Sequence, residues 1–295
     1  MFFLVIFIFT CAAKAGLSLN VSNPCPSMCK CTPEETILCN RAGLKTLPGE
    51  IAASTISLNL SNNYLRILNT NTFRNLTFLH SLWLDGNNLT FLTPGTFHLL
   101  RLGMLNLGHN FITDLPNQLF EGLIQLKTMH LEANRITAVG CTFRGLLNLR
   151  NLYLNNNQIS SISDSAFLYL NKLHFLHLSR NNLSSLPVRL FTELTKLKYV
   201  FLSHNPWRCD CSLLWFWRWT AARRAVIEGL DCTFLGPPNT TAPQQPRPGD
   251  LGDCTLPLEL ASEDKCRVAD TSVAPKPPAL PGQNVFQTHH ICPCP

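Results

Sequence analysis

Leucines recur over residues 55–205 in a unit that the chain repeats seven times. Five copies follow the pattern L-x-x-L-x-L-x-x-N, beginning with LHSLWLDGN at residues 79–87, with Met129 in place of one leucine. Weaker copies flank them, with Thr55 replacing the first leucine of one and Val200 the second leucine of the other. A spacing of 23 or 24 residues separates the terminal asparagines, which are Asn63, Asn87, Asn110, Asn134, Asn157, Asn181 and Asn205. Repetition at this period indicates a solenoid built from one stacked unit.

Each copy predicts a short strand followed by a tight turn. The L-x-L alternation places two apolar side chains on one face of the strand, pointing into the solenoid. The asparagine turns inward, where its amide satisfies backbone groups that the turn leaves unpaired. A phenylalanine follows each of the first six asparagines and fills the core from the opposite side: Phe73, Phe97, Phe120, Phe143, Phe167 and Phe191. Neighbouring units are expected to stack into a parallel sheet, because one unit alone cannot bury its apolar face.

Cysteine clusters stand at both ends of the repeat, where a solenoid would otherwise expose its core. The first cluster comprises Cys25, Cys29, Cys31 and Cys39, and the second Cys209, Cys211, Cys232 and Cys254. Disulfides are favoured over metal ligation, because the chain begins with a signal-peptide pattern and no matching histidine spacing is present. Spacing alone leaves three connectivities open for each set of four.

The repeat and its two clusters resemble the extracellular leucine-rich-repeat family with cysteine-rich caps, the group of the Nogo receptors, Slit proteins and nyctalopin. The resemblance covers roughly residues 24–254, and the segment from Asn205 to Cys211 is among its most specific parts. It implies an α/β leucine-rich-repeat solenoid, with a curved parallel sheet on the concave side, an irregular or short-helical convex side, and disulfide caps at both ends. It also implies the pairs Cys25–Cys31, Cys29–Cys39, Cys209–Cys232 and Cys211–Cys254.

The remaining segments suggest how the chain is divided. An apolar run at residues 2–9, followed by Ala13-Lys14-Ala15, predicts a signal peptide over residues 1–15. A membrane anchor is the alternative, but the run is well short of the ~20 residues that a span needs. We expect the remaining boundaries to give an N-terminal cap at 24–54, the array at 55–205, a C-terminal cap at 206–273 and a Pro-rich disordered tail at 274–295.

We expect the chain to be secreted, either into the extracellular space or into association with the cell surface or matrix. A truncated form of an anchored receptor is an open alternative.

Residues 212–225 (SLLWFWRWTAARRA) predict a helix that covers the end of the array, rather than a membrane-surface helix. Cys141 is expected to be a buried hydrophobe, with a free thiol or a long-range bridge as the alternative. Six sequons agree with secretion: Asn20, Asn59, Asn75, Asn88, Asn182 and Asn239.

Composition and charge exclude several functions. With 45% hydrophobic and 14% charged residues, the chain can bury a substantial core. Residues 1–205 carry 16 Lys/Arg against 9 Asp/Glu without a basic run, which is too dilute to indicate nucleic-acid binding. The sequence lacks a Gly-rich phosphate loop, G-x-S-x-G and H-E-x-x-H, so neither an enzyme nor a cofactor or metal site is expected.

Variable residues around the strand leucines are expected to face the concave surface in two columns. The column between the leucines contains Asn59, Trp83, Asn106, His130, Tyr153, His177 and Phe201. The next column contains Ser61, Asp85, Gly108, Glu132, Asn155, Ser179 and Ser203. Rigid amphipathic side chains are favoured in protein interfaces, although stacked aromatics that merely cover their neighbours are the alternative. The predicted partner-binding patch is therefore Trp83, Asp85, His130, Glu132, Tyr153, His177 and Phe201.

These features favour a module that recognises another extracellular protein through its concave face. The family resemblance implies a setting in cell-surface signalling, adhesion or neuronal wiring. The alternative is a structural matrix protein that binds collagen or glycosaminoglycan, which would need a basic stripe on the array. The surplus lysines and arginines mostly fall outside the concave columns, so a glycosaminoglycan contact stays an open question.

Overall fold

The computed structural model describes residues 25–49, 51–97, 100–208, 213–223 and 225–230, all within one compact unit spanning residues 1–260. The expected signal peptide, both C-terminal cysteine pairs, the tail and the sequons Asn20 and Asn239 lie outside the described residues. Among the described residues, no helix is long and apolar enough to cross a membrane.

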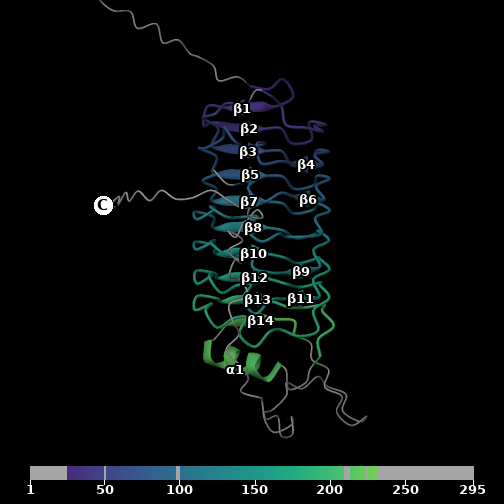
Figure 1. Ribbon diagram of the computed structural model, residues 1–295, viewed down its shortest axis with the longest axis vertical. Helices are drawn as coiled ribbons and strands as arrows, with labels where there is room; N and C mark the ends of the chain where they lie inside the picture. The colour runs from purple at the N-terminus through teal and green to yellow at the C-terminus, as the bar shows by residue number, and fades with distance from the viewer. Residues whose placement is uncertain (1–24, 50, 98–99, 209–212, 224, 231–295) are drawn as a thin grey trace, which may run out of the picture. The chain divides into compact units, whose positions relative to one another are not determined.

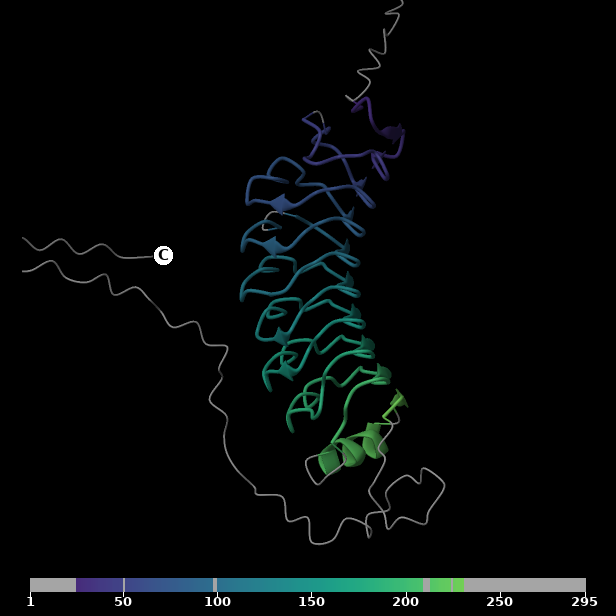
Figure 2. The same ribbon diagram turned by 90° about the vertical axis from the view of Figure 1, so that its right-hand side faces the viewer.

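A ten-stranded sheet runs along the concave side of the array (Figures 1 and 2). Strands β1 and β2 pair antiparallel, and every other neighbouring pair is parallel. The order of strands across the sheet is β1 (Lys30–Thr32), β2 (Thr36–Leu38), β3 (Ser57–Asn59), β5 (Ser81–Trp83), β7 (Met104–Asn106), β8 (Thr128–His130), β10 (Asn151–Tyr153), β12 (Phe175–His177), β13 (Tyr199–Phe201) and β14 (Val226–Glu228). The predicted leucine-rich-repeat solenoid is therefore confirmed.

The convex side carries turns and two short strand pairs. Strand β4 (Ile67–Leu68) pairs with β6 (Phe91–Leu92), and β9 (Ala138–Val139) pairs with β11 (Ser161–Ile162). Figure 2 shows these pairs on the side opposite the ten-stranded sheet. Each repeat thus forms one turn of the solenoid, here called a rung.

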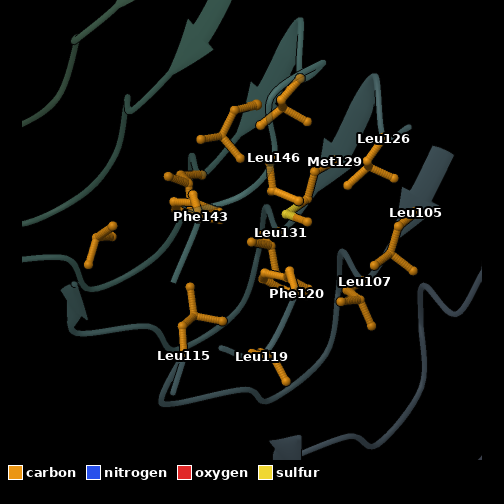
Figure 3. Close-up of a cluster of buried hydrophobic side chains, with 14 of the residues drawn as sticks. Leu105, Leu107, Leu115, Leu119, Phe120, Leu126, Met129, Leu131, Phe143 and Leu146 are labelled. Atoms are coloured by element: carbon orange, nitrogen blue, oxygen red, sulfur yellow. The ribbon is translucent and has the colours of Figure 1, made fainter. Parts of the chain in front are cut away.

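The core lies between these two sides and follows the leucine pattern. Leu105 and Leu107 of one rung, and Met129 and Leu131 of the next, are completely buried (Figure 3). The phenylalanines form a continuous spine, in which successive ring centroids from Phe73 to Phe167 lie 6.0 to 6.2 Å apart. Because every rung shares its core with both neighbours, the stack is held together along its whole length.

The seven asparagines connect neighbouring rungs through backbone hydrogen bonds. The Nδ2 group of Asn110 donates to the carbonyls of Leu107 (3.1 Å), Gly108 (3.0 Å) and, in the preceding rung, Leu84 (3.0 Å). Its Oδ1 accepts from the amide of Leu89 at 3.1 Å. The other six asparagines make the equivalent contacts. One residue type at one offset therefore satisfies the turn in every repeat.

Both ends of the array are covered. At the N-terminal end, the bridges Cys25–Cys31 and Cys29–Cys39 have the pairing that the family resemblance implies. At the other end, helix α1 (Leu214–Arg223) places the rings of Phe216 and Trp219 at 5.7 and 5.2 Å from that of Phe191. The helix is a lid on the last rung, since the rings of Trp215, Phe216 and Trp219 all pack against Phe191.

Cys141 confirms one part of its expectation, which was a buried hydrophobe, and departs from the other. Its side chain is buried and disulfide-bonded. The other four described cysteines pair among themselves, so the partner of Cys141 lies outside the described residues. The long-range bridge, which was the less favoured interpretation, is the one that the structure has.

Candidate functional site

The column predicted between the strand leucines forms one continuous row across the sheet. Strand register pairs each of its members with the next, so that every rung contributes one side chain to the row. All seven are half-buried, because the flanking rungs cover their sides and leave their outer surfaces open. The row, from the N-terminal rung, is Asn59, Trp83, Asn106, His130, Tyr153, His177 and Phe201.

Five of the seven predicted patch residues come together at the C-terminal half of the row. The rings of His130 and Tyr153 stack face to face, with centroids 4.3 Å apart and planes inclined by 4°. The rings of His177 and Phe201 lie 5.0 Å apart. Both carboxylate oxygens of Glu132 lie 3.2 Å from Nδ1 of His130. Two aromatic pairs and one acid therefore share this surface.

Phe175 joins the two pairs, and the sequence prediction missed it. Its ring centroid lies 4.9 Å from that of Tyr153, 5.1 Å from that of Phe201 and 6.1 Å from that of His177. It is the first residue of β12, in a column that the prediction did not place on the concave surface. The sequence does carry a signal for Phe175. It is an aromatic residue at a position where most repeats have Ser, Thr, Asn or Met. We define the aromatic patch as His130, Glu132, Tyr153, Phe175, His177 and Phe201.

Trp83 and Asp85 stand apart from the aromatic patch. Strand β7, which carries Asn106, lies between Trp83 and His130. Two strand spacings of ~4.8 Å put about 9.6 Å between those two positions. Asp85 accepts a hydrogen bond of 2.6 Å from Oγ of Ser61, one rung toward the N-terminus. The predicted patch is therefore not one contiguous surface.

Glu132 is held as a carboxylate by its neighbours. Burial by itself would raise its pKa, but hydrogen bonds from His130 and from its own backbone amide, with the charges of His130 and His109, lower the pKa below 4.5. Gly108 provides the space for this side chain, because a Cβ on Gly108 would lie 2.9 Å from Oε1 of Glu132. The patch therefore has a negative charge at one edge.

Burial favours the neutral forms of Tyr153 and His177. Burial raises the pKa of Tyr153 above its ordinary 10.0, and the nearby charge of Glu132 adds to the effect. Burial lowers the pKa of His177 below 6.5, against the opposing charges of Glu228 and Glu132. A phenol and a neutral imidazole offer a partner both ring surface and hydrogen-bonding groups.

We expect Glu132→Gln to be less stable than the wild-type protein at pH 7, with the difference shrinking on acidification. Since the pKa of Glu132 is lower in the folded chain, its stabilising effect is present above pH 4.5 and lost as the pH falls through the lowered value. Urea unfolding at several pH values measures this. In a His130→Asn background the pH dependence of the difference should weaken. A difference that stays constant from pH 7 to pH 3 would contradict the assignment.

The described sequons differ in their relation to the patch. Asn75 and Asn182 are exposed. Asn59 is half-buried at the start of the concave row, where its Oδ1 accepts a hydrogen bond of 2.9 Å from the amide of Ser61. Strands β5 and β7 separate it from His130 on β8. A glycan on Asn59 would therefore be attached at the N-terminal end of the row and not within the aromatic patch.

Known proteins share the repeat with this chain. Residues 77–136 and 147–206 match the family model described as Leucine rich repeat. Reticulon-4 receptor-like 2 from Homo sapiens is 36% identical over 93 residues, which cover 31% of this chain and 22% of that protein. Leucine-rich repeat-containing G-protein coupled receptor 5A from Xenopus laevis is 38% identical over 76 residues, covering 25% of this chain and 8% of that protein. The chain thus matches less than a quarter of the length of either relative.

A solved structure of a TLR13–ssRNA13 complex also resembles the array. The two are 28% identical with a TM-score of 0.44, over 62% of this chain and 23% of the other. A likeness of that size carries no argument about a ligand of this chain.

Proposed function

We propose that this chain binds another extracellular protein through the aromatic patch on its concave face. Its repeats match the leucine-rich-repeat family model, and two disulfides lie at its N-terminal end. The observation that carries the proposal is the contact of Phe175 with Tyr153, His177 and Phe201. The core beneath these rings is already complete, since Leu152, Leu176 and Val200 are fully buried. The rings lie above this core, with their outer surfaces open to a partner.

The patch has the properties of a protein-binding hot spot. Aromatic side chains with few rotatable bonds dominate the binding free energy of protein interfaces when they cluster at the centre of a contact. Here the strands on which they stand are hydrogen-bonded on both sides, so little ordering is needed when a partner binds. Glu132 at the edge favours a partner that presents a lysine or arginine beside an apolar surface.

The cellular setting is part of the same proposal. Two relatives are named as receptors or receptor-like, and disulfides persist in oxidising compartments. We therefore place the chain outside the cell or at its surface, in signalling, adhesion or neuronal wiring. Catalysis has no part in the proposed role.

A binding screen against a library of extracellular domains tests the proposal. With a partner from that screen, we expect Tyr153→Ala and Phe175→Ala each to weaken binding by about tenfold or more, as removal of a central aromatic does in protein interfaces. Surface plasmon resonance measures the affinity, and circular dichroism checks that each variant is folded.

Tyr64→Ala is the matched control, because Tyr64 is 58% exposed and lies outside the concave row. It should bind as the wild-type protein does. Trp83→Ala tests how far the contact extends toward the N-terminal rungs. A partner that binds folded Tyr153→Ala and Phe175→Ala with unchanged affinity would refute the aromatic patch.

A further inference from the structure

Basic side chains gather next to the N-terminal ends of the strands that form the concave sheet. Strands β8, β10, β12 and β13 are each preceded by a buried leucine, and the residues on both sides of that leucine point outward. In the rungs of β8, β10, β12 and β13, five of these eight flanking positions are basic: Lys127, Arg150, Lys172, Lys196 and Lys198. The other three are Gln125, Asn148 and His174, so no acid interrupts the set. We call the five charged residues the basic ridge.

Backbone hydrogen bonds place three ridge residues in one row across successive rungs, with His174 between the second and the third. The amide of Arg150 donates to the carbonyl of Lys127 at 2.8 Å, and the amide of His174 donates to that of Arg150 at 2.8 Å. The amide of Lys198 donates in turn to the carbonyl of His174 at 2.9 Å. The row therefore advances by one strand spacing, about 4.8 Å, at each rung.

The charges of the ridge are not neutralised by described acids. All five side chains are exposed. Within the described part of the chain, the ion pair is that of His130 with Glu132, so none of the five lies within 4.0 Å of a described carboxylate. Lys172 donates instead to Oδ1 of Asn148 at 2.6 Å, one rung toward the N-terminus. Five cations along one edge leave a strong local positive potential.

We propose that the basic ridge binds a linear sulfated polysaccharide. Such a chain carries sulfate and carboxylate groups at regular intervals, which suits a ridge with at least one lysine or arginine in each of four successive rungs. It can bend to follow the array, whereas a lipid surface would reach only the charges that share one plane. Binding of a linear polyanion to several Lys/Arg side chains releases condensed counterions and weakens as salt rises.

The ridge also bears on the alternative role in the extracellular matrix. A matrix or glycosaminoglycan role needs a basic stripe, and the two predicted concave columns contain no lysine or arginine. The stripe lies beyond the column of Phe175 and Tyr199, next to the start of the strands. This site is independent of the aromatic patch, so either can be wrong without the other.

The test compares two variants with the same change in net charge, in the full chain. Lys127→Gln, Arg150→Gln and Lys198→Gln together remove three ridge charges, while Lys45→Gln, Arg66→Gln and Arg74→Gln remove three exposed charges elsewhere. We expect the ridge variant to bind heparin at least about tenfold more weakly at low salt, with a shallower dependence of affinity on salt concentration. The control variant should stay close to the wild-type protein, and Tyr153→Ala should retain heparin binding.

Chemically desulfated heparin and vesicles containing phosphatidylserine complete the design. Desulfated heparin should bind weakly, and vesicles should not retain the protein at the salt concentration where heparin does. Equal losses of heparin affinity in the ridge and control variants would overturn the proposal, since net charge alone would then explain them. Equal binding of desulfated heparin, or retention on vesicles without heparin binding, would overturn it as well.

Discussion

Phe120→Ala is expected to lower the free energy of unfolding by about 3–5 kcal/mol. Phe120 is completely buried in the middle of the phenylalanine spine, with its ring centroid 6.0 Å from that of Phe97 and 6.1 Å from that of Phe143. Removing the ring leaves a cavity that faces two rungs. Because a solenoid is stabilised by contacts between nearest neighbours, both rung interfaces lose contacts at once.

Urea unfolding followed by circular dichroism measures this loss. Phe78→Ala is the matched control, because it removes the same ring from a position that is 62% exposed. Its effect should be within about 0.5 kcal/mol, as is usual for exposed positions. Similar losses for the two variants would mean that the spine does not carry the stability assigned to it.

Asn157→Ala is expected to lower the free energy of unfolding by about 2–4 kcal/mol, because it leaves several buried backbone groups without partners. Its Nδ2 group donates to the carbonyls of Leu131 (2.9 Å), Leu154 (3.1 Å) and Asn155 (3.4 Å). Its Oδ1 accepts from the amide of Ile136 at 3.0 Å. Alanine can replace none of these contacts, and the turn is too enclosed for water to do so freely.

Gln158→Ala is the control for this substitution, because Gln158 is the next residue and its side chain is exposed. It should leave stability nearly unchanged. Native-state hydrogen exchange adds a local measurement: the amide of Ile136 should exchange faster in Asn157→Ala than in Gln158→Ala. Unchanged protection of Ile136 would show that the asparagine is not the acceptor that matters in the turn.

The patch and the ridge adjoin on the same face of the array. Phe175 belongs to the patch and follows His174, which lies in the row that links Arg150 to Lys198. A polysaccharide on the ridge would therefore lie beside a protein on the patch. Measuring protein affinity with and without heparin would show whether the two ligands affect each other.

The repeating fold was predictable because each position in the unit has one physical role in every rung. Leu105 and Leu107 point inward through strand alternation, Phe120 fills the core, and Asn110 satisfies the turn. An offset of 23 or 24 residues therefore translates directly into contact between neighbours. For the same reason the concave row from Asn59 to Phe201 follows from the sequence.

What surrounds each side chain on the surface was decided by the tertiary structure. Phe175 belongs to a different column from Tyr153, yet the two rings meet because large side chains lean across columns. Trp83 was grouped with His130 by residue type, but the intervening strand separates them.

The basic ridge and the Cys141 disulfide are two further features that the tertiary structure decides. Lys127, Arg150 and Lys198 are more than twenty residues apart in sequence and show no basic run, but stacking brings them into one row. Cys141 gave no local sign of its bridge. The sequence by itself determined the repeating unit, since backbone and core contacts recur at a constant offset. Surface clusters depend on side chains from different rungs meeting in space, and only the stacked structure decides that.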